Sequence, residues 1–235
     1  ITTFSLTDMR CVATTADYII PAGSSTGTAA ASGVPSSLSP VRGVGWTAGI
    51  GSAYLQHPTL LVGVDSNRAT TVGATSISAD GGRSWGSSMV SVARSAFRGG
   101  VCNDAFWNGV VWAAVGYDAN TGSKVAISKD GVSWTQIPPG NVPITGILYS
   151  IMWNGTVWMV GGDGSPTDDP FSASVAWSTN LITWTGIPNT DTKITITKRI
   201  AWNGMYWVAV GAGDVSTIMH SRDPGGLIWE DTYLS

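Results

Sequence analysis

The chain has 235 residues, of which 43% are hydrophobic and 11% are charged, with a formal net charge of −3. This apolar content supports a packed core and excludes a disordered chain. The twelve Lys and Arg residues are scattered, so we expect no nucleic-acid partner, and no run reaches eighteen apolar residues, so we expect no membrane insertion.

The first third of the chain predicts strands whose repeat pattern is weak. Strands ending in glycine are expected at residues 19–23 and 60–63. Residues 39–46 match a turn motif poorly, because Ser39, Gly43 and Trp46 hold its spacing while Val41 stands where an Asp is needed. Residues 78–85 match the same motif, S-x-D-x-G-x-x-W, at every position.

A short phrase, Trp-Asn-Gly, recurs at residues 107–109, 153–155 and 202–204, at intervals of about 46 and 49 residues. Asn-Gly favours a two-residue type I′ hairpin turn, because both residues tolerate a positive φ. Such a turn would pair Trp107 with Val110. It would make Trp107 and Trp112 diagonal neighbours on one face of the hairpin.

Two further markers follow each phrase. A glycine stands nine residues after the Trp, at Gly116, Gly162 and Gly211, and ends the second strand. The turn motif then returns at residues 128–134, at 178–184 with Asn180 for the acid, and at 221–229 with Asp223. In the third unit this predicts strands at residues 100–107, 110–116, 124–128 and 133–137.

Together these markers predict an all-β fold, a five-bladed β-propeller with four-stranded blades of about 47 residues. We expect a single domain over residues 1–235 and little helix. The expected blades are residues 1–48, 49–91, 92–138, 139–188 and 189–235.

The turn motif resembles the Asp box of sialidase-like (BNR repeat) propellers. The Trp-Asn-Gly phrase is similar to repeats in propellers of phage and large-virus surface proteins. By this resemblance the box joins the third and fourth strands of a blade, and its Ser and Asp bind the backbone of the turn. Asp80, Asp130 and Asp223 would then be structural. Both kinds of turn would lie at one face, which leaves the opposite face for function.

At that opposite face, the loops after the strand-ending glycines repeat an acid. The expected ligand-binding residues are these acids and their polar or aromatic neighbours: Asp65, Asn67, Arg68, Tyr117, Asp118, Asn120, Asp163 and Asp214. One interpretation is that Asp simply favours loops. The other is a ring that binds sugar hydroxyls or a cation, since sugar sites combine polar groups with flat aromatic faces. We expect no cofactor, with calcium at residues 163–169 as an alternative.

The leading hypothesis is a noncatalytic module that binds a glycan or a host surface receptor. The resemblance implies the head of a viral or phage spike or fibre, or a secreted adhesin, with other virion or fibre subunits as further partners. Its location would be extracellular or the virion surface. A structural scaffold and a glycoside hydrolase are the alternatives, although Glu230 is the only Glu for hydrolytic chemistry. Cys11 and Cys102 are either buried thiols, a disulfide or a reactive thiol.

Overall fold

A computed structural model describes the backbone of five strands in the first 78 residues, and then residues 96–97, 100–131, 133–164 and 173–231. The chain divides into two compact units. One comprises Ile1–Ala114, Asp118–Asn120 and Ala126–Gln136, and the other comprises Val115–Tyr117, Thr121–Val125 and Ile137–Ser235. Each unit is described by itself.

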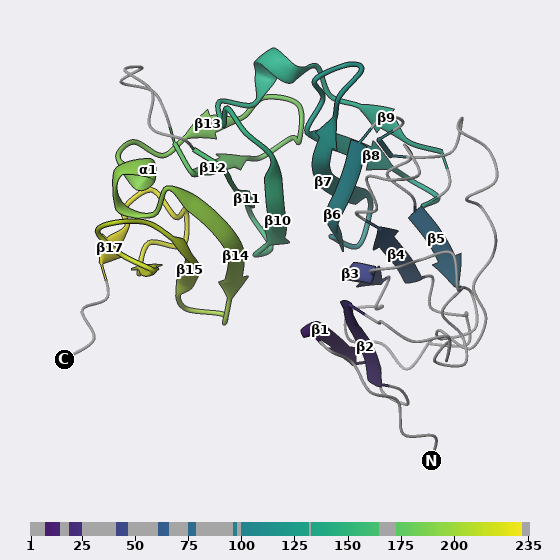
Figure 1. Cartoon of the computed structure of the whole chain (residues 1–235), viewed down its shortest axis with the longest axis horizontal. Coiled ribbons are helices and arrows are strands. Elements are labelled where there is room, and N and C mark those ends of the chain that lie inside the picture. The colour runs from purple at the N-terminus through teal and green to yellow at the C-terminus, as the bar shows by residue number, and fades with distance from the viewer. Residues whose placement is uncertain are drawn as a thin grey trace. The chain divides into compact units, whose positions relative to one another are not determined.

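The described chain is all-β, as predicted (Figure 1). Within each sheet, strands that are neighbours in the sequence are also neighbours in the sheet. Three sheets have four strands each. They are β6 (Gly100–Trp107), β7 (Trp112–Asp118), β8 (Val125–Ser128) and β9 (Thr135–Gln136); β10 (Leu148–Trp153), β11 (Trp158–Gly162), β12 (Val175–Ser178) and β13 (Thr185–Gly186); and β14 (Ile196–Trp202), β15 (Trp207–Ala212), β16 (Ile218–Ser221) and β17 (Glu230–Asp231).

Before these sheets, β1 (Asp8–Thr14) pairs with β2 (Ile19–Ser24), and β3 (Val41–Trp46), β4 (Leu61–Asp65) and β5 (Thr75–Ser78) form a three-stranded sheet. We number the sheets in chain order, so that β6–β9 form the third sheet, β10–β13 the fourth and β14–β17 the fifth. Two short helical elements complete the described structure, the 3-10 turn η4 (Pro139–Asn141) and the helix α1 (Thr190–Lys193). No described helix has the length and apolar character of a membrane span.

The prediction for residues 39–46 is wrong. Val41–Trp46 is not a turn motif but the first strand of a sheet, with Trp46 opposite Leu61. This is the place that Trp153 takes opposite Trp158 in the fourth sheet. The spacing of Ser39, Gly43 and Trp46 was a chance match, and the expected blade boundary after residue 48 separates β3 from its own sheet.

In the second unit, the core lies between the fourth and fifth sheets. Strand β14 packs alongside β10 and β11. The fourth sheet and its following link contribute Val157, Met159, Val175, Ile187 and Ile194, and the fifth sheet contributes Ile200, Trp207, Ala209, Met219 and Trp229. Burying a side chain such as Met159 stabilises the fold by about 1.5–3 kcal/mol. These two sheets are therefore held face to face by apolar side chains.

The first unit has a separate described core. Phe97, Cys102 and Trp112 are fully buried there, with Ala96, Ala105, Ala114 and Ala126 around them. Small alanine side chains on three strands leave room for the large ring of Trp112. Cys102 is buried, whereas the side chain of Cys11 lies outside the described residues.

The glycines that end the second strands allow close contact between strands. A Cβ on Gly162 would lie 2.7 Å from the carbonyl oxygen of Ile147, and one on Gly211 would overlap the carbonyl oxygen of Ile196. Gly161 has a related role, because its Cβ would lie 2.5 Å from Cγ2 of Thr197 in the neighbouring sheet. The recurrent glycine is thus explained by steric contact rather than by an unusual φ.

Candidate functional site

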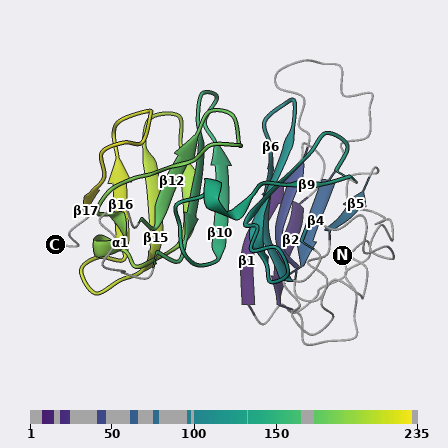
Figure 2. The ribbon, with the colours of Figure 1, turned by 90° about the horizontal axis from the view of Figure 1, so that it is seen from above.

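Each complete sheet has two ends that carry connections, and Figure 2 shows the strands from β10 to β17 running between them. We call one the turn end, because it carries the Trp-Asn-Gly turns and the turns between third and fourth strands. We call the other the loop end. There the second strands end, followed by the acids that the sequence singled out.

The Trp-Asn-Gly turns do not have the expected register. Trp153 lies directly opposite Trp158, and Trp202 directly opposite Trp207, rather than diagonally. The glycine has a φ near +100°, at +102° for Gly155, and no Asn of these phrases has a positive φ. The turn therefore centres on the glycine and the residue after it, which is the pattern of type II′ rather than type I′.

The physical reason is the side chain of the Asn. In the fourth sheet the Asn154 Oδ1 accepts hydrogen bonds from the backbone N–H groups of Thr156 and Val157, at 2.9 and 2.8 Å. The turns at Asn108 and Asn203 have the same pair of bonds. Asn thus acts as a side-chain acceptor that closes the turn.

This register stacks the paired tryptophans. Their ring centroids lie 5.4 Å apart for Trp107 and Trp112, and 5.1 Å apart in the fourth and fifth sheets. The rings are tilted by 43–47°, which is within the range of favourable aromatic contacts. The second tryptophan of each pair is buried. These residues therefore stabilise the hairpins and present little surface to a ligand.

The turns between third and fourth strands, at residues 128–134, 178–184 and 221–229, bind their own backbone, as expected. In the first of them the Ser128 Oγ accepts from the N–H of Gly131 at 2.8 Å, and the Asp130 carboxylate accepts from the N–H of Ser133 at 2.7 Å. The Trp134 Nε1 donates to the carbonyl of Gly131 at 3.2 Å. The acid is therefore part of the turn.

The other two copies repeat this arrangement. Asn180 accepts from the N–H groups of Ile182 and Thr183, both at 2.9 Å, and Asp223 accepts from the N–H groups of Gly225 and Leu227. The prediction of a structural role is confirmed for Asp130 and Asp223. Asp80 lies outside the described residues.

Both kinds of turn meet at the turn end, which confirms another expectation. The carbonyl oxygen of Pro224, in the fifth sheet, accepts from Asn154 Nδ2 of the fourth sheet at 2.8 Å. It also accepts from Trp207 Nε1 at 3.0 Å. The two sheets are thus joined by hydrogen bonds at this end.

At the loop end of the third sheet, Asp118 is fully buried. Its two carboxylate oxygens accept hydrogen bonds from the N–H of Asn120 at 2.9 Å and from Gln136 Nε2 at 2.6 Å. Gln136 also donates to the carbonyl of Ala96. Asp118 therefore holds its loop to the fourth strand, while Tyr117 is half-buried and Asn120 is exposed.

In the second unit, Asp163 and Asp214 have different environments. The backbone N–H of Asp163 donates to the carbonyl of Ile147, and its carbonyl accepts from Gly146, both at 2.9 Å. Its side chain is half-buried, whereas Asp214 lies exposed in the loop after β15. The residue that the structure brings next to this stretch is Asp191 of α1, which is buried against Gly164. Asp191 was not predicted, because it does not follow a strand-ending glycine in the sequence.

The remaining predicted residues are described in part or not at all. Asp65 is the last residue of β4 and takes the position that Gly162 and Gly211 hold in their sheets, rather than following such a glycine. Asn67 and Arg68 lie outside the described residues, as do residues 165–169 of the segment that was the alternative calcium site. Among the residues that are described, no group of three or more His, Cys, Asp and Glu is arranged to hold a metal ion.

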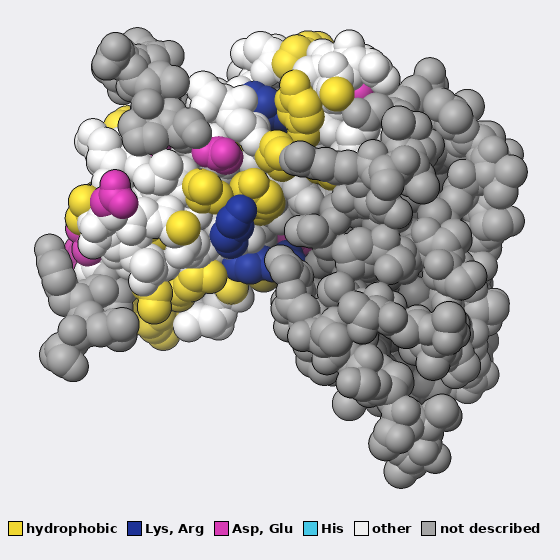
Figure 3. Space-filling model, in the orientation of Figure 1, with side chains coloured by type: hydrophobic (Ala, Val, Ile, Leu, Met, Phe, Trp, Pro, Cys, Tyr) yellow, Lys and Arg dark blue, Asp and Glu magenta, His cyan; other side chains and the backbone are white. Residues whose placement is uncertain are grey.

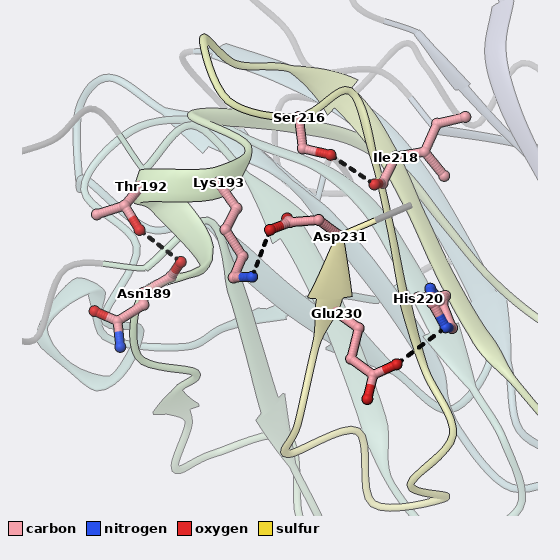
Figure 4. A network of polar contacts seen from close by, with 8 residues as sticks. All are labelled: Asn189, Thr192, Lys193, Ser216, Ile218, His220, Glu230 and Asp231. Carbon is pink, nitrogen blue, oxygen red and sulfur yellow. Dashed lines mark hydrogen bonds and ion pairs between the residues drawn. The ribbon is translucent and has the colours of Figure 1, made fainter. Parts of the chain in front are cut away.

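Polar contacts also fasten the last sheet to α1 (Figure 4). The Lys193 Nζ lies 2.8 Å from the Asp231 carboxylate, so the link before β14 is tied to β17. The His220 Nε2 lies 3.4 Å from the Glu230 carboxylate on the neighbouring strand. The only Glu of the chain is thus at a surface strand pair beside a His, which is a cross-strand contact typical of sheets.

One lysine at the loop end is buried. Lys124, just before β8, is 8% exposed, and its ammonium donates to the carbonyl of Ile144. Burial lowers the pKa of Lys124, because the apolar surroundings disfavour the charged form. Lys124 is thus bound to the backbone of the link before β10, and its burial costs the desolvation of its ammonium.

Two residues that the sequence did not single out form an exposed contact. The Lys198 ammonium of β14 lies 3.5 Å from the ring centroid of Tyr149 on β10. Lys198 is exposed and Tyr149 is half-buried. Figure 3 shows basic side chains gathered over β10 and β14. Both residues stand four positions before the hairpin tryptophan of their sheet, which is the signal that the sequence carries for them.

Comparison with known proteins finds no matching family model and no matching curated protein. Among solved structures, the chain is similar to a GH74 enzyme of Niastella koreensis, at 19% identity and a TM-score of 0.43, over 73% of this chain and 23% of that chain. It is also similar to the GH74 xyloglucanase from Xanthomonas campestris, at 14% identity and a TM-score of 0.40, over 83% of this chain and 32% of that one. The chain spans less than a third of the length of each.

Proposed function

We propose that this chain is a five-bladed β-propeller that acts as a noncatalytic recognition module and binds a glycan or a cell-surface receptor through its loop end. The five described sheets, each starting with a hairpin, support the blade number. The proposed setting is the head of a viral or phage spike or fibre, or a secreted adhesin, outside the cell or on the virion surface.

The observation that carries the proposal is the contact between Tyr149 and Lys198. Glycan sites combine an aromatic ring with a few polar groups that fix the orientation of the sugar. Tyr149 supplies the ring, and Lys198 supplies an ammonium with three hydrogen-bond donors at an exposed position. The exposed side chains of Asn120 and Asp214 add polar groups to the loop end of their own sheets.

The carboxylates of the described chain support a noncatalytic function. Asp118, Asp130 and Asp223 accept hydrogen bonds from neighbouring backbone or amide groups. Glycoside hydrolysis needs two carboxyl groups facing one bond, one of them held protonated. These three carboxylates instead bind groups of their own turns or of their own sheet.

A glycan array with the intact chain tests the proposal. We expect binding that is lost in Tyr149→Ser and kept in Tyr206→Ser, because Tyr206 is half-buried at the turn end. No binding to any glycan or to host cells would refute the recognition function. Binding that is lost in Tyr206→Ser instead would place the site at the turn end.

A second function, assembly with other virion or fibre subunits, is favoured by exposed apolar side chains at the turn end. Met205 is 62% exposed and Ile228 is 67% exposed, and Ile182 and Leu227 are exposed in the turns between third and fourth strands. Apolar side chains gathered at one surface are typical of protein interfaces. We expect Met205→Lys with Ile228→Lys to weaken assembly of the particle and to leave glycan binding unchanged. Normal assembly of this variant would refute the second function.

A further inference from the structure

The first strands share an irregularity at one level of their sheets. In four of them the pairing with the second strand skips one residue close to the loop end. The skipped residues are Arg10 in β1, Arg42 in β3, Tyr149 in β10 and Lys198 in β14. We call these four the bulge residues. A β-bulge leaves one residue unpaired and redirects the side chains around it.

The fifth sheet shows how the bulge acts on side chains. Thr197 and Ile200 both pack against Gly161 of the neighbouring sheet, although residues three apart face opposite sides of a regular strand. The extra residue between them, Lys198, makes this possible. Lys198 itself is exposed. The bulge therefore keeps the first strand packed on its neighbour while turning one side chain outward.

The bulge residues of neighbouring first strands meet in the second unit. Lys198 and Tyr149 come from the bulges of β14 and β10, and the ammonium lies 3.5 Å from the ring centroid. A cation–π contact holds the ammonium in place without neutralising its charge. In the described part of the chain, no ion pair is formed by Lys198.

The composition of the bulge residues is strongly biased. Lys and Arg make up only twelve of the 235 residues, about one in twenty, yet three of the four bulge residues are Lys or Arg. The net charge of the chain is −3, so this concentration runs against the overall charge. By sequence spacing the third sheet has Asn103 at this position, and it is buried.

We infer that Lys198 and Tyr149, the two bulge residues of the second unit, form the anion-binding part of the recognition site, and that its ligand is an acidic glycan whose carboxylate is bound by Lys198. The inference rests on the proposed function and specifies its ligand class. Lys198 donates hydrogen bonds to the carboxylate, and the Tyr149 ring fixes the ammonium beside the sugar.

The test compares two ligands of one shape that differ in charge. Tetragalacturonate carries carboxylates, and its full methyl ester does not. In isothermal titration calorimetry with the intact chain, we expect the acid to bind at least tenfold more tightly than the ester. This difference in affinity should become smaller at high salt. Lys198→Gln is expected to weaken binding of the acid by about tenfold and to leave the ester unchanged.

Lys129→Gln is the matched control, because Lys129 is an exposed lysine in the turn at residues 128–134 and the substitution removes the same charge. Lys198→Arg should keep the preference for the acid, which separates loss of charge from loss of fold. Equal affinities for the acid and the ester would overturn the inference. So would equal effects of Lys198→Gln and Lys129→Gln on the affinity for the acid. In either case, binding on the array would still support the proposed glycan binding. No binding of the chain to any glycan on the array would refute both the inference and the proposed glycan binding.

Discussion

The glycine near the end of the second strand in the fourth and fifth sheets offers a sharp test of how the strands fit together. In Gly211→Ala the new Cβ would overlap the carbonyl oxygen of Ile196 and lie 2.9 Å from Cγ2 of Ile194. A backbone carbonyl in a paired strand cannot turn aside as a flexible side chain can. We expect a loss of about 3 kcal/mol in the free energy of unfolding, the upper part of the range for overpacked positions.

Gly140→Ala is the matched control. Gly140 lies in η4, is exposed, and a Cβ there meets nothing within 4 Å. We expect it to change the free energy of unfolding by less than about 0.5 kcal/mol. Urea unfolding followed by tryptophan fluorescence measures both variants. In a thermal melt the loss in Gly211→Ala corresponds to about 6–12 °C. Equal midpoints for the two variants would refute the steric explanation.

Three further predictions concern hydrogen bonds and charge. Ser178→Ala removes the acceptor of the Leu181 N–H and should cost about 1 kcal/mol in urea unfolding; an unchanged midpoint would contradict this. Asn154→Ala should cost about 1 kcal/mol more than Asn203→Ala, because it also removes the bond to Pro224; equal losses would count against that link. The stability of the parent chain relative to Lys124→Met should rise with pH between the lowered pKa of Lys124 and about 10.4, because only the unfolded state binds the proton there; a flat difference would show that Lys124 is not desolvated.

The sequence predicted the repeating sheets because their turns are local. The strand at residues 100–107 was predicted with the bounds that β6 has, and the hydrogen bonding of Asp130 and Asp223 follows from the motif alone. The hairpin register was wrong, because Asn154 acts through its side chain rather than through its φ. Both conformations are compatible with an Asn-Gly pair, so sequence reasoning had no basis for choosing between them.

The candidate site was harder to predict, because burial and register depend on other strands. Asp118 looked like a loop acid, but its contact with Gln136 is made across the sheet and has no sequence signal. The bulge at Lys198 arises where β14 must pack on Gly161. Its position relative to the hairpin tryptophan was visible in the sequence, although only the pairing of the strands gives that spacing a meaning.

The most direct test of the account is a crystal structure of the chain with the tightest-binding acidic glycan bound. We expect it to show five four-stranded blades and a ligand carboxylate within hydrogen-bond distance of the Lys198 ammonium, beside the Tyr149 ring. A glycan bound among the Trp-Asn-Gly turns, or one that leaves Lys198 without contact, would contradict it.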